Sequence, residues 1–116
     1  EKYEYPINRY AMETKRIFDV ADQRLAQSRF LAGDDYSLAD IANFPWLAPF
    51  VWGEIYNDAR TFLSIDDYTH VKRWVDEIAV RPAVRRGRIV NKTWGDPATQ
   101  LKERHCAADF ADRHLP

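Results

Sequence analysis

Apolar residues recur every three or four positions in the first part of the chain. Between residues 6 and 27 they are Ile7, Tyr10, Ala11, Ile17, Phe18, Ala21 and Leu25. This spacing places them on one face of a helix, whereas a strand would show an apolar residue at every second position. Pro6 suits the first turn of that helix, because its missing N–H would have had no partner there. The pattern predicts a helix over residues 6–27 and a turn around Gly33.

The sharpest helix start lies at Ser37 and Asp40, which have the spacing of a capping box. The Ser37 hydroxyl can accept from the amide of residue 40, while the Asp40 carboxylate accepts from the amide of Ser37. Tyr36 and Ile41 occupy the two positions of a hydrophobic staple around that cap. The alternative for Asp40, a buried catalytic carboxylate, is disfavoured because the cap already explains its position. The nearly apolar run up to residue 52 predicts a helix buried on most sides and kinked at Pro45.

Two more helices are predicted further along the chain. Over residues 68–79 an apolar stripe carries Tyr68, Val71, Val75 and Ile78, with Trp74 beside it. Pro82 opens the next helix, over residues 82–91, whose inward residues are Ala83, Val84, Gly87 and Val90. Residues 92–116 are mostly polar and predict an extended tail with one short helix near Leu101. The sequence therefore predicts an all-α fold, a helical bundle.

The composition fits a single domain without disulfides. A length of 116 residues allows one hydrophobic core, and 46% apolar residues argue against disorder. The net charge of -1 gives no field that would attract nucleic acid or an anionic membrane. Cys106 is the single cysteine, so no intrachain disulfide is possible, and a reducing cytoplasm is the expected compartment. We expect no signal peptide, and the most apolar window, residues 38–52, is too short to span a membrane.

Two groups of side chains suggest chemistry but favour simpler interpretations. A basic stripe on the last predicted helix consists of Arg81, Arg85, Arg88 and Lys92, with Arg86 adjacent. It would suit phosphates, yet the balanced charge favours a solvated face or internal ion pairs. Atoms that can bind metal occur in the tail at His105, Cys106, Asp109 and His114. Their spacing is not that of a zinc site, and Cys106 has no identifiable base, so we expect neither a metal site nor a nucleophile there.

Several short motifs, taken in order, resemble the C-terminal helical domain of glutathione transferases. Residues 30–40 (FLAGDDYSLAD) are similar to that family's capping box, and residues 68–74 (YTHVKRW) and 81–84 (RPAV) to its next two helices. Residues 5–10 (YPINRY), 43–46 (NFPW) and 86–91 (RGRIVN) resemble the bacterial nu class, the disulfide-bond-reductase branch. The resemblance covers nearly the whole chain, and the succession of motifs is more specific than any single one.

The resemblance implies that this chain is the C-terminal part of a two-domain enzyme. An N-terminal thioredoxin-like domain, whose pattern is absent here, would hold most glutathione contacts and the group that activates the thiol. Residues 1–91 would form the C-terminal helical domain without its first helix, and residues 92–116 an extended tail. The nu class further implies a homodimer, two glutathione molecules or one glutathione disulfide per site, and reduction of disulfides or peroxides.

One ligand contact follows residue by residue from the resemblance. Arg9 matches the arginine with which nu-class enzymes bind a glutathione carboxylate, and Tyr5 flanks it one turn earlier. A guanidinium suits this task because its planar fork can hold a carboxylate through two hydrogen bonds. Without the resemblance, the simpler interpretation of Arg9 is a surface ion pair with Glu13. Trp46 and Trp94 are further candidates for the second-substrate pocket, with core packing favoured for Trp46.

A function of a different class remains open, because helical domains similar to this one also act as non-catalytic protein interaction modules. Arg9 with Tyr5 one turn before it favours the enzyme, since a scaffold has no need of that arginine. A thioredoxin-like sequence upstream would support the enzyme, and its absence would support the module.

Overall fold

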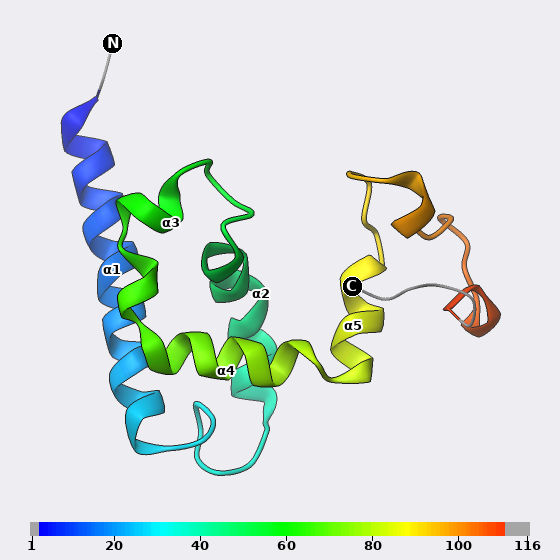
Figure 1. Ribbon diagram of the computed structural model, residues 1–116, viewed down its shortest axis with the longest axis horizontal. Helices are drawn as coiled ribbons and strands as arrows, with labels where there is room; N and C mark the ends of the chain where they lie inside the picture. The colour runs from blue at the N-terminus through cyan, green and yellow to red at the C-terminus, as the bar shows by residue number, and fades with distance from the viewer. Residues whose placement is uncertain (1–2, 111–116) are drawn as a thin grey trace. The chain divides into compact units, whose positions relative to one another are not determined.

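The computed structural model describes residues 3–110, whose regular elements are all helical (Figure 1). The α-helices are α1 (Glu4–Gln27), α2 (Leu38–Trp52), α3 (Ala59–Phe62), α4 (Thr69–Ala79) and α5 (Pro82–Ile89). The shorter 3-10 helices are η1 (Ile65–Asp67), η2 (Pro97–Thr99) and η3 (Ala107–Phe110). The chain divides into two compact units, residues 1–76 and 77–116. The all-α prediction is confirmed, and the predicted boundary at residue 91 stays a prediction.

The core of the first unit is centred on Phe18 of α1, which is fully buried. Its ring lies 5.7 Å from the ring of Phe50 and 5.3 Å from that of Tyr68, measured between centroids. In the same unit the predicted apolar stripe around α4 is buried at Tyr68, Val71, Trp74 and Val75, and its last member, Ile78, is buried in the second unit. The three- and four-residue spacing of these apolar side chains therefore identified the inward face of α4 correctly.

Helices α1 and α4 are joined by hydrogen bonds between the side chains of one helix and the backbone of the other. Asp22 of α1 accepts hydrogen bonds from the backbone amides of His70 and Val71, both at 2.9 Å. These amides lie in the first turn of α4, where backbone N–H groups have no partner within the helix. Arg73 of α4 donates in return to the carbonyl of Leu25 near the end of α1, at 3.1 Å. Side chains distant in sequence thus replace local caps at both places.

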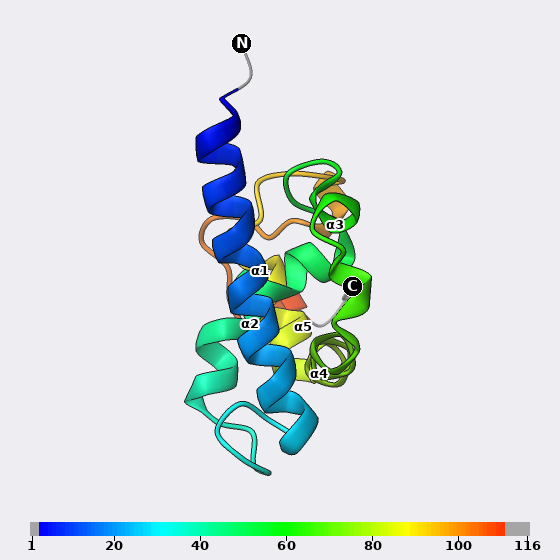
Figure 2. The ribbon, with the colours of Figure 1, turned by 90° about the vertical axis from the view of Figure 1, so that its left-hand side faces the viewer.

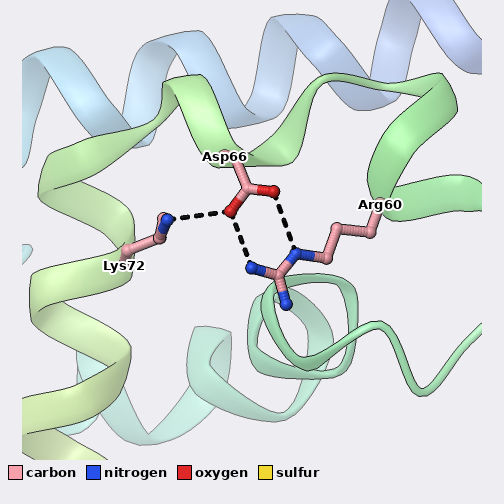
Figure 3. A network of polar contacts seen from close by, with 3 residues as sticks. All are labelled: Arg60, Asp66 and Lys72. Atoms are coloured by element: carbon pink, nitrogen blue, oxygen red, sulfur yellow. Dashed lines mark hydrogen bonds and ion pairs between the residues drawn. The ribbon is translucent and has the colours of Figure 1, made fainter.

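The segment between α2 and α4 folds into α3 and η1, which the sequence pattern did not predict. It contains three non-glycine residues with positive φ, namely Tyr56 at 54°, Asn57 at 55° and Ser64 at 54°. Asp66 joins this segment to α4, because it pairs with Arg60 at 2.7 Å and with Lys72 at 2.8 Å (Figure 3). The hydrogen bond from Arg60 is the largest influence that holds the pKa of Asp66 far below its usual value. Since the side chains are partly exposed, the network fixes the path of the chain more than it stabilises the fold.

Helix α2 continues through two prolines, Pro45 and Pro49. Each proline lacks an N–H and leaves the carbonyl four residues earlier without a helical partner. Those carbonyls belong to Ile41 and Pro45, both of which are exposed, so water can hydrate them. In Figure 1 the first half of α2 is seen from the side and the second half nearly end-on, so the helix bends along its length. The helix ends at Gly53, whose φ of 70° is the left-handed conformation that glycine adopts without strain.

Three predicted inward faces are wrong in part. Helix α2 is buried on one side only, since Trp46 is 76% exposed and Leu38 and Ile41 also face solvent. On α1, Ile7, Tyr10 and Ile17 are exposed, whereas Phe18, Ala21 and Leu25 are buried. On α5, the buried residue is Ile89, while Ala83, Gly87 and Val90 are exposed. Apolar spacing identifies a helix face, but another element must be present before that face is covered.

Candidate functional site

Arg9 and Tyr5, the two residues predicted to contact glutathione, lie on one exposed face of α1. They are four residues apart, so their side chains are neighbours on consecutive turns. Figures 1 and 2 show that these first turns extend past the other helices of the first unit. An open depression follows this face and includes Tyr5 and Arg9 together with Asn8, Met12, Glu13 and Arg16.

Glu13 is paired with Arg16 and not with Arg9. Nε and Nη2 of Arg16 donate to the two carboxylate oxygens of Glu13 at 2.8 and 2.7 Å, which is a bidentate ion pair. The hydrogen bond from Arg16 is the largest influence that lowers the pKa of Glu13, and the Coulombic attraction of Arg9 is the smallest. The ion pair between Arg9 and Glu13, which the sequence analysis gave as the simpler interpretation, is therefore not formed, because Glu13 pairs with Arg16. The alternative three-residue spacing to Arg16 was visible in the sequence, but spacing alone does not choose between the two cations.

The guanidinium of Arg9 is consequently open. Within residues 3–110 it takes part in no hydrogen bond and no ion pair. An arginine carries five N–H donors in a planar fork and stays charged at any physiological pH. The side chain of Tyr3, the N-cap residue of α1, accepts no hydrogen bond from the first amides of this helix. Both features favour an anion near this end of α1.

Ser37 and Asp40 form the capping box at the start of α2. Asp40 is fully buried and accepts from the backbone amides of Ser37 at 2.9 Å and Leu31 at 3.0 Å, and from Nε1 of Trp74 at 2.8 Å. Burial alone would raise the pKa of Asp40, but these hydrogen bonds outweigh it and hold the pKa below its usual value. Both carboxylate oxygens of Asp40 accept hydrogen bonds from the protein, which supports a structural role for this residue. Asp40 joins the loop after α1, the start of α2 and the middle of α4.

Replacing Ser37 with alanine should lower the free energy of unfolding by roughly 0.5–2 kcal/mol, with little change in glutathione affinity of the folded protein. The Ser37 hydroxyl accepts from the amide of Ala39 at 3.3 Å, a long bond, so we expect the lower part of that range. Thermal unfolding and calorimetric titration of one protein preparation measure both quantities. Unchanged melting together with lost glutathione binding would contradict the structural assignment.

Trp46 lies in an apolar groove and not in the core. The groove runs between α1, α2 and α3, and its lining includes Tyr10, Trp46, Phe50 and Phe62. None of the residues that line it carries a charge. An apolar surface of this kind suits a hydrophobic ligand or another part of a larger protein. Trp94, the other tryptophan considered for a pocket, is 67% exposed and lies in the second unit.

The basic stripe and the tail interact within the chain. Arg81, Arg85 and Arg88 each interact with other groups of the chain, and Nζ of Lys92 donates to the Thr99 hydroxyl at 3.1 Å. Asp109 accepts from the amide of Cys106 at 2.7 Å and pairs with Lys102 at 2.9 Å, and these contacts lower its pKa to about 2.

No group of His, Cys, Asp and Glu side chains suited to a metal ion occurs in residues 3–110, and His114 lies outside the described residues. Across the same range, none of the helices has both the length and the apolar character needed to cross a membrane.

Comparison with known proteins gives concordant matches. The family model "Glutathione S-transferase, C-terminal domain" matches residues 8–82. Disulfide-bond oxidoreductase YghU of Escherichia coli is 54% identical over 109 residues, which are 94% of this chain and 38% of the relative. Disulfide-bond oxidoreductase YfcG of Escherichia coli is 39% identical over 79 residues, which are 68% of this chain and 33% of the relative.

A solved structure extends the match to three dimensions. Glutathione transferase YghU from Streptococcus pneumoniae, crystallised in complex with glutathione, is 46% identical and superposes with a TM-score of 0.75. The alignment covers 80% of this chain and 36% of that one. The matched part of the present chain thus spans about a third of the length of these relatives, between 33% and 38%.

Proposed function

The chain belongs to the glutathione S-transferase family, whose C-terminal domain it carries, and we propose on that premise that it is the C-terminal part of a glutathione-dependent disulfide-bond oxidoreductase. Two relatives that match at least 68% of this chain carry the name disulfide-bond oxidoreductase, which supports this reaction class. The observation that carries the proposal at the level of residues is the exposed Arg9 guanidinium, which has no partner among residues 3–110. It stands where the resemblance puts a contact to a glutathione carboxylate.

In this proposal the helical domain binds the ligand and does not itself react. Arg9 holds a carboxylate of glutathione or of glutathione disulfide, and Tyr5 flanks the same ligand one turn earlier. The residues of the apolar groove at Trp46 line the second-substrate pocket. The glutathione found in the Streptococcus pneumoniae neighbour supports this choice of ligand. The thiol-activating group belongs to a thioredoxin-like domain outside these 116 residues, and the whole protein acts as a cytoplasmic homodimer.

The proposed reaction transfers two electrons from glutathione to a disulfide. Two glutathione thiols give up two protons and two electrons and become joined as glutathione disulfide. The substrate S–S bond accepts those electrons and protons and is released as two thiols. Glutathione is therefore the reductant, and no further redox group is required for the balance.

The whole protein should catalyse glutathione-dependent reduction of a small organic disulfide, whereas residues 1–116 alone should give no turnover above the uncatalysed rate. The reason is that the activating group and most glutathione contacts are expected outside this chain, so it cannot orient a thiol for attack. Formation of glutathione disulfide measures the rate in both cases. Turnover by residues 1–116 alone would contradict this division of roles. A whole protein that binds no glutathione in calorimetry would favour the alternative, a non-catalytic interaction module.

A further inference from the structure

Three charged residues, Arg9, Glu13 and Arg16, follow one another on the exposed face of α1. Glu13 lies four residues after Arg9 and three residues before Arg16, so its carboxylate can reach either guanidinium. The structure places both of its oxygens on Arg16, at 2.7 and 2.8 Å. The choice agrees with helix electrostatics, because a pair with the acid nearer the helix N-terminus is favoured over the reverse order. Arg9 keeps only a longer-range attraction to Glu13.

This choice matters for any anion that approaches Arg9. A Glu13 carboxylate paired with Arg9 would occupy the same N–H donors that a ligand carboxylate needs. It would also repel that ligand, because two like charges would face each other across one turn of helix. Pairing with Arg16 removes the competition for the donors and offsets the negative charge.

We propose that Arg16 is a positioning residue for the glutathione contact, in that it holds Glu13 in a bidentate ion pair and thereby keeps the Arg9 guanidinium open to an anionic ligand. The inference rests on the proposed function, since it concerns the same ligand contact. Arg16 touches no ligand in this arrangement and acts only through Glu13. The carboxylate of Glu13 would otherwise compete with the ligand for the N–H donors of Arg9, so its position affects the affinity of Arg9 for anions.

The test is calorimetric titration of the whole protein with glutathione disulfide, for the wild type, Arg16→Gln, Glu13→Gln and the double variant. We expect Arg16→Gln to weaken binding by about 2- to 10-fold. In this variant Glu13 forms a weak, exposed ion pair with Arg9, and its negative charge repels the ligand carboxylate. Glu13→Gln added to Arg16→Gln should restore wild-type affinity, because the competitor is gone. The loss caused by Arg16→Gln should also shrink as salt is raised from about 0.01 M to 1 M, where screening shortens the Debye length from about 30 Å to 3 Å.

Arg24→Gln serves as the matched control. It removes one positive charge from the same helix, but Arg24 contacts the carbonyl of Leu31 and has no contact with Glu13. Its affinity should equal that of the wild type. An Arg16→Gln variant no weaker than this control, in a protein where Arg9→Ala does weaken binding, would overturn the inference and leave the proposed function intact. A double variant as weak as Arg16→Gln would also overturn it, because Arg16 would then act without Glu13. If Arg9→Ala itself has no effect, it is the proposed glutathione contact that fails.

Discussion

Replacing Asp40 with alanine should lower the free energy of unfolding by about 3–5 kcal/mol, a large loss for a single polar side chain. The carboxylate is fully buried, and its removal leaves the amide of Leu31 and Nε1 of Trp74 without an acceptor. Each buried donor without a partner costs roughly 1–3 kcal/mol, and the cap of α2 is lost as well. Urea unfolding followed by tryptophan fluorescence measures the difference. A loss smaller than that caused by Ser37→Ala would show that Asp40 does not join these elements.

Asp40→Asn separates the charge of Asp40 from its shape. Because hydrogen bonds hold its folded-state pKa below the unfolded value, the unfolded protein binds more protons between those two values. The stabilisation by the charge is therefore fully present above a pH of about 4, the ordinary range of an aspartate, and is lost as the pH falls through the lower, folded-state pKa. The advantage of the wild type over Asp40→Asn should accordingly be greatest at neutral pH and shrink in acid. An advantage that stays constant from neutral pH into acid would mean that the charge makes no contribution.

The helices were predictable from the sequence wherever local signals agree with the final packing. The predicted bounds of α2 match because its start depends on a capping box within four residues and its end on a single glycine, Gly53. Helix α4 was placed correctly because its apolar stripe is covered inside this chain. In both cases the information that determines the element lies within the element or beside it.

What the sequence did not predict depends on partners distant along the chain. The hydrogen bonds from His70 and Val71 to Asp22 join positions separated by 48 and 49 residues, and no local pattern announces them. The segment between α2 and α4, which forms α3 and η1, contains three non-glycine residues with positive φ, a conformation that is uncommon outside glycine. The exposed apolar positions of α1 have the same spacing as the buried ones, and the nearly apolar run of α2 favoured core packing for Trp46, which the structure leaves exposed.

In the candidate site, too, one property of Arg9 was predictable from the local sequence pattern and another required the structure. Exposure of Arg9 was predictable from its place on the polar side of an amphipathic helix. Its lack of an ion pair was not, because Glu13 has a cation at each of the two favourable spacings. Only the distances from Glu13 to Arg16 show which cation it contacts. The functional interpretation of Arg9 thus depends on a neighbour that the motif itself does not include.

Arg9→Ala in the whole protein should weaken the binding of glutathione or glutathione disulfide by about 10- to 150-fold. This range corresponds to the roughly 1.5–3 kcal/mol that a hydrogen bond to a charged group contributes. The wild-type guanidinium has no partner within residues 3–110 to give up, so little of the binding energy is lost to breaking an existing pair. The start of α1, which lacks a side-chain cap, favours the same negative charge. Calorimetric titration at one salt concentration measures the change, and circular dichroism checks the fold, which alanine should preserve as the better helix former.

Arg9→Lys distinguishes the geometry of the contact from its charge. A lysine keeps the positive charge but offers a point charge in place of a planar fork, so it should recover only part of the lost affinity. If the interaction were purely Coulombic, Arg9→Lys would bind as tightly as the wild type and both would weaken in parallel as salt is raised. A bidentate contact instead leaves a gap between arginine and lysine that persists at high salt, because hydrogen-bond geometry is not screened. Equal affinities for the wild type, Arg9→Lys and Arg9→Ala would mean that Arg9 is a surface charge with no role in binding.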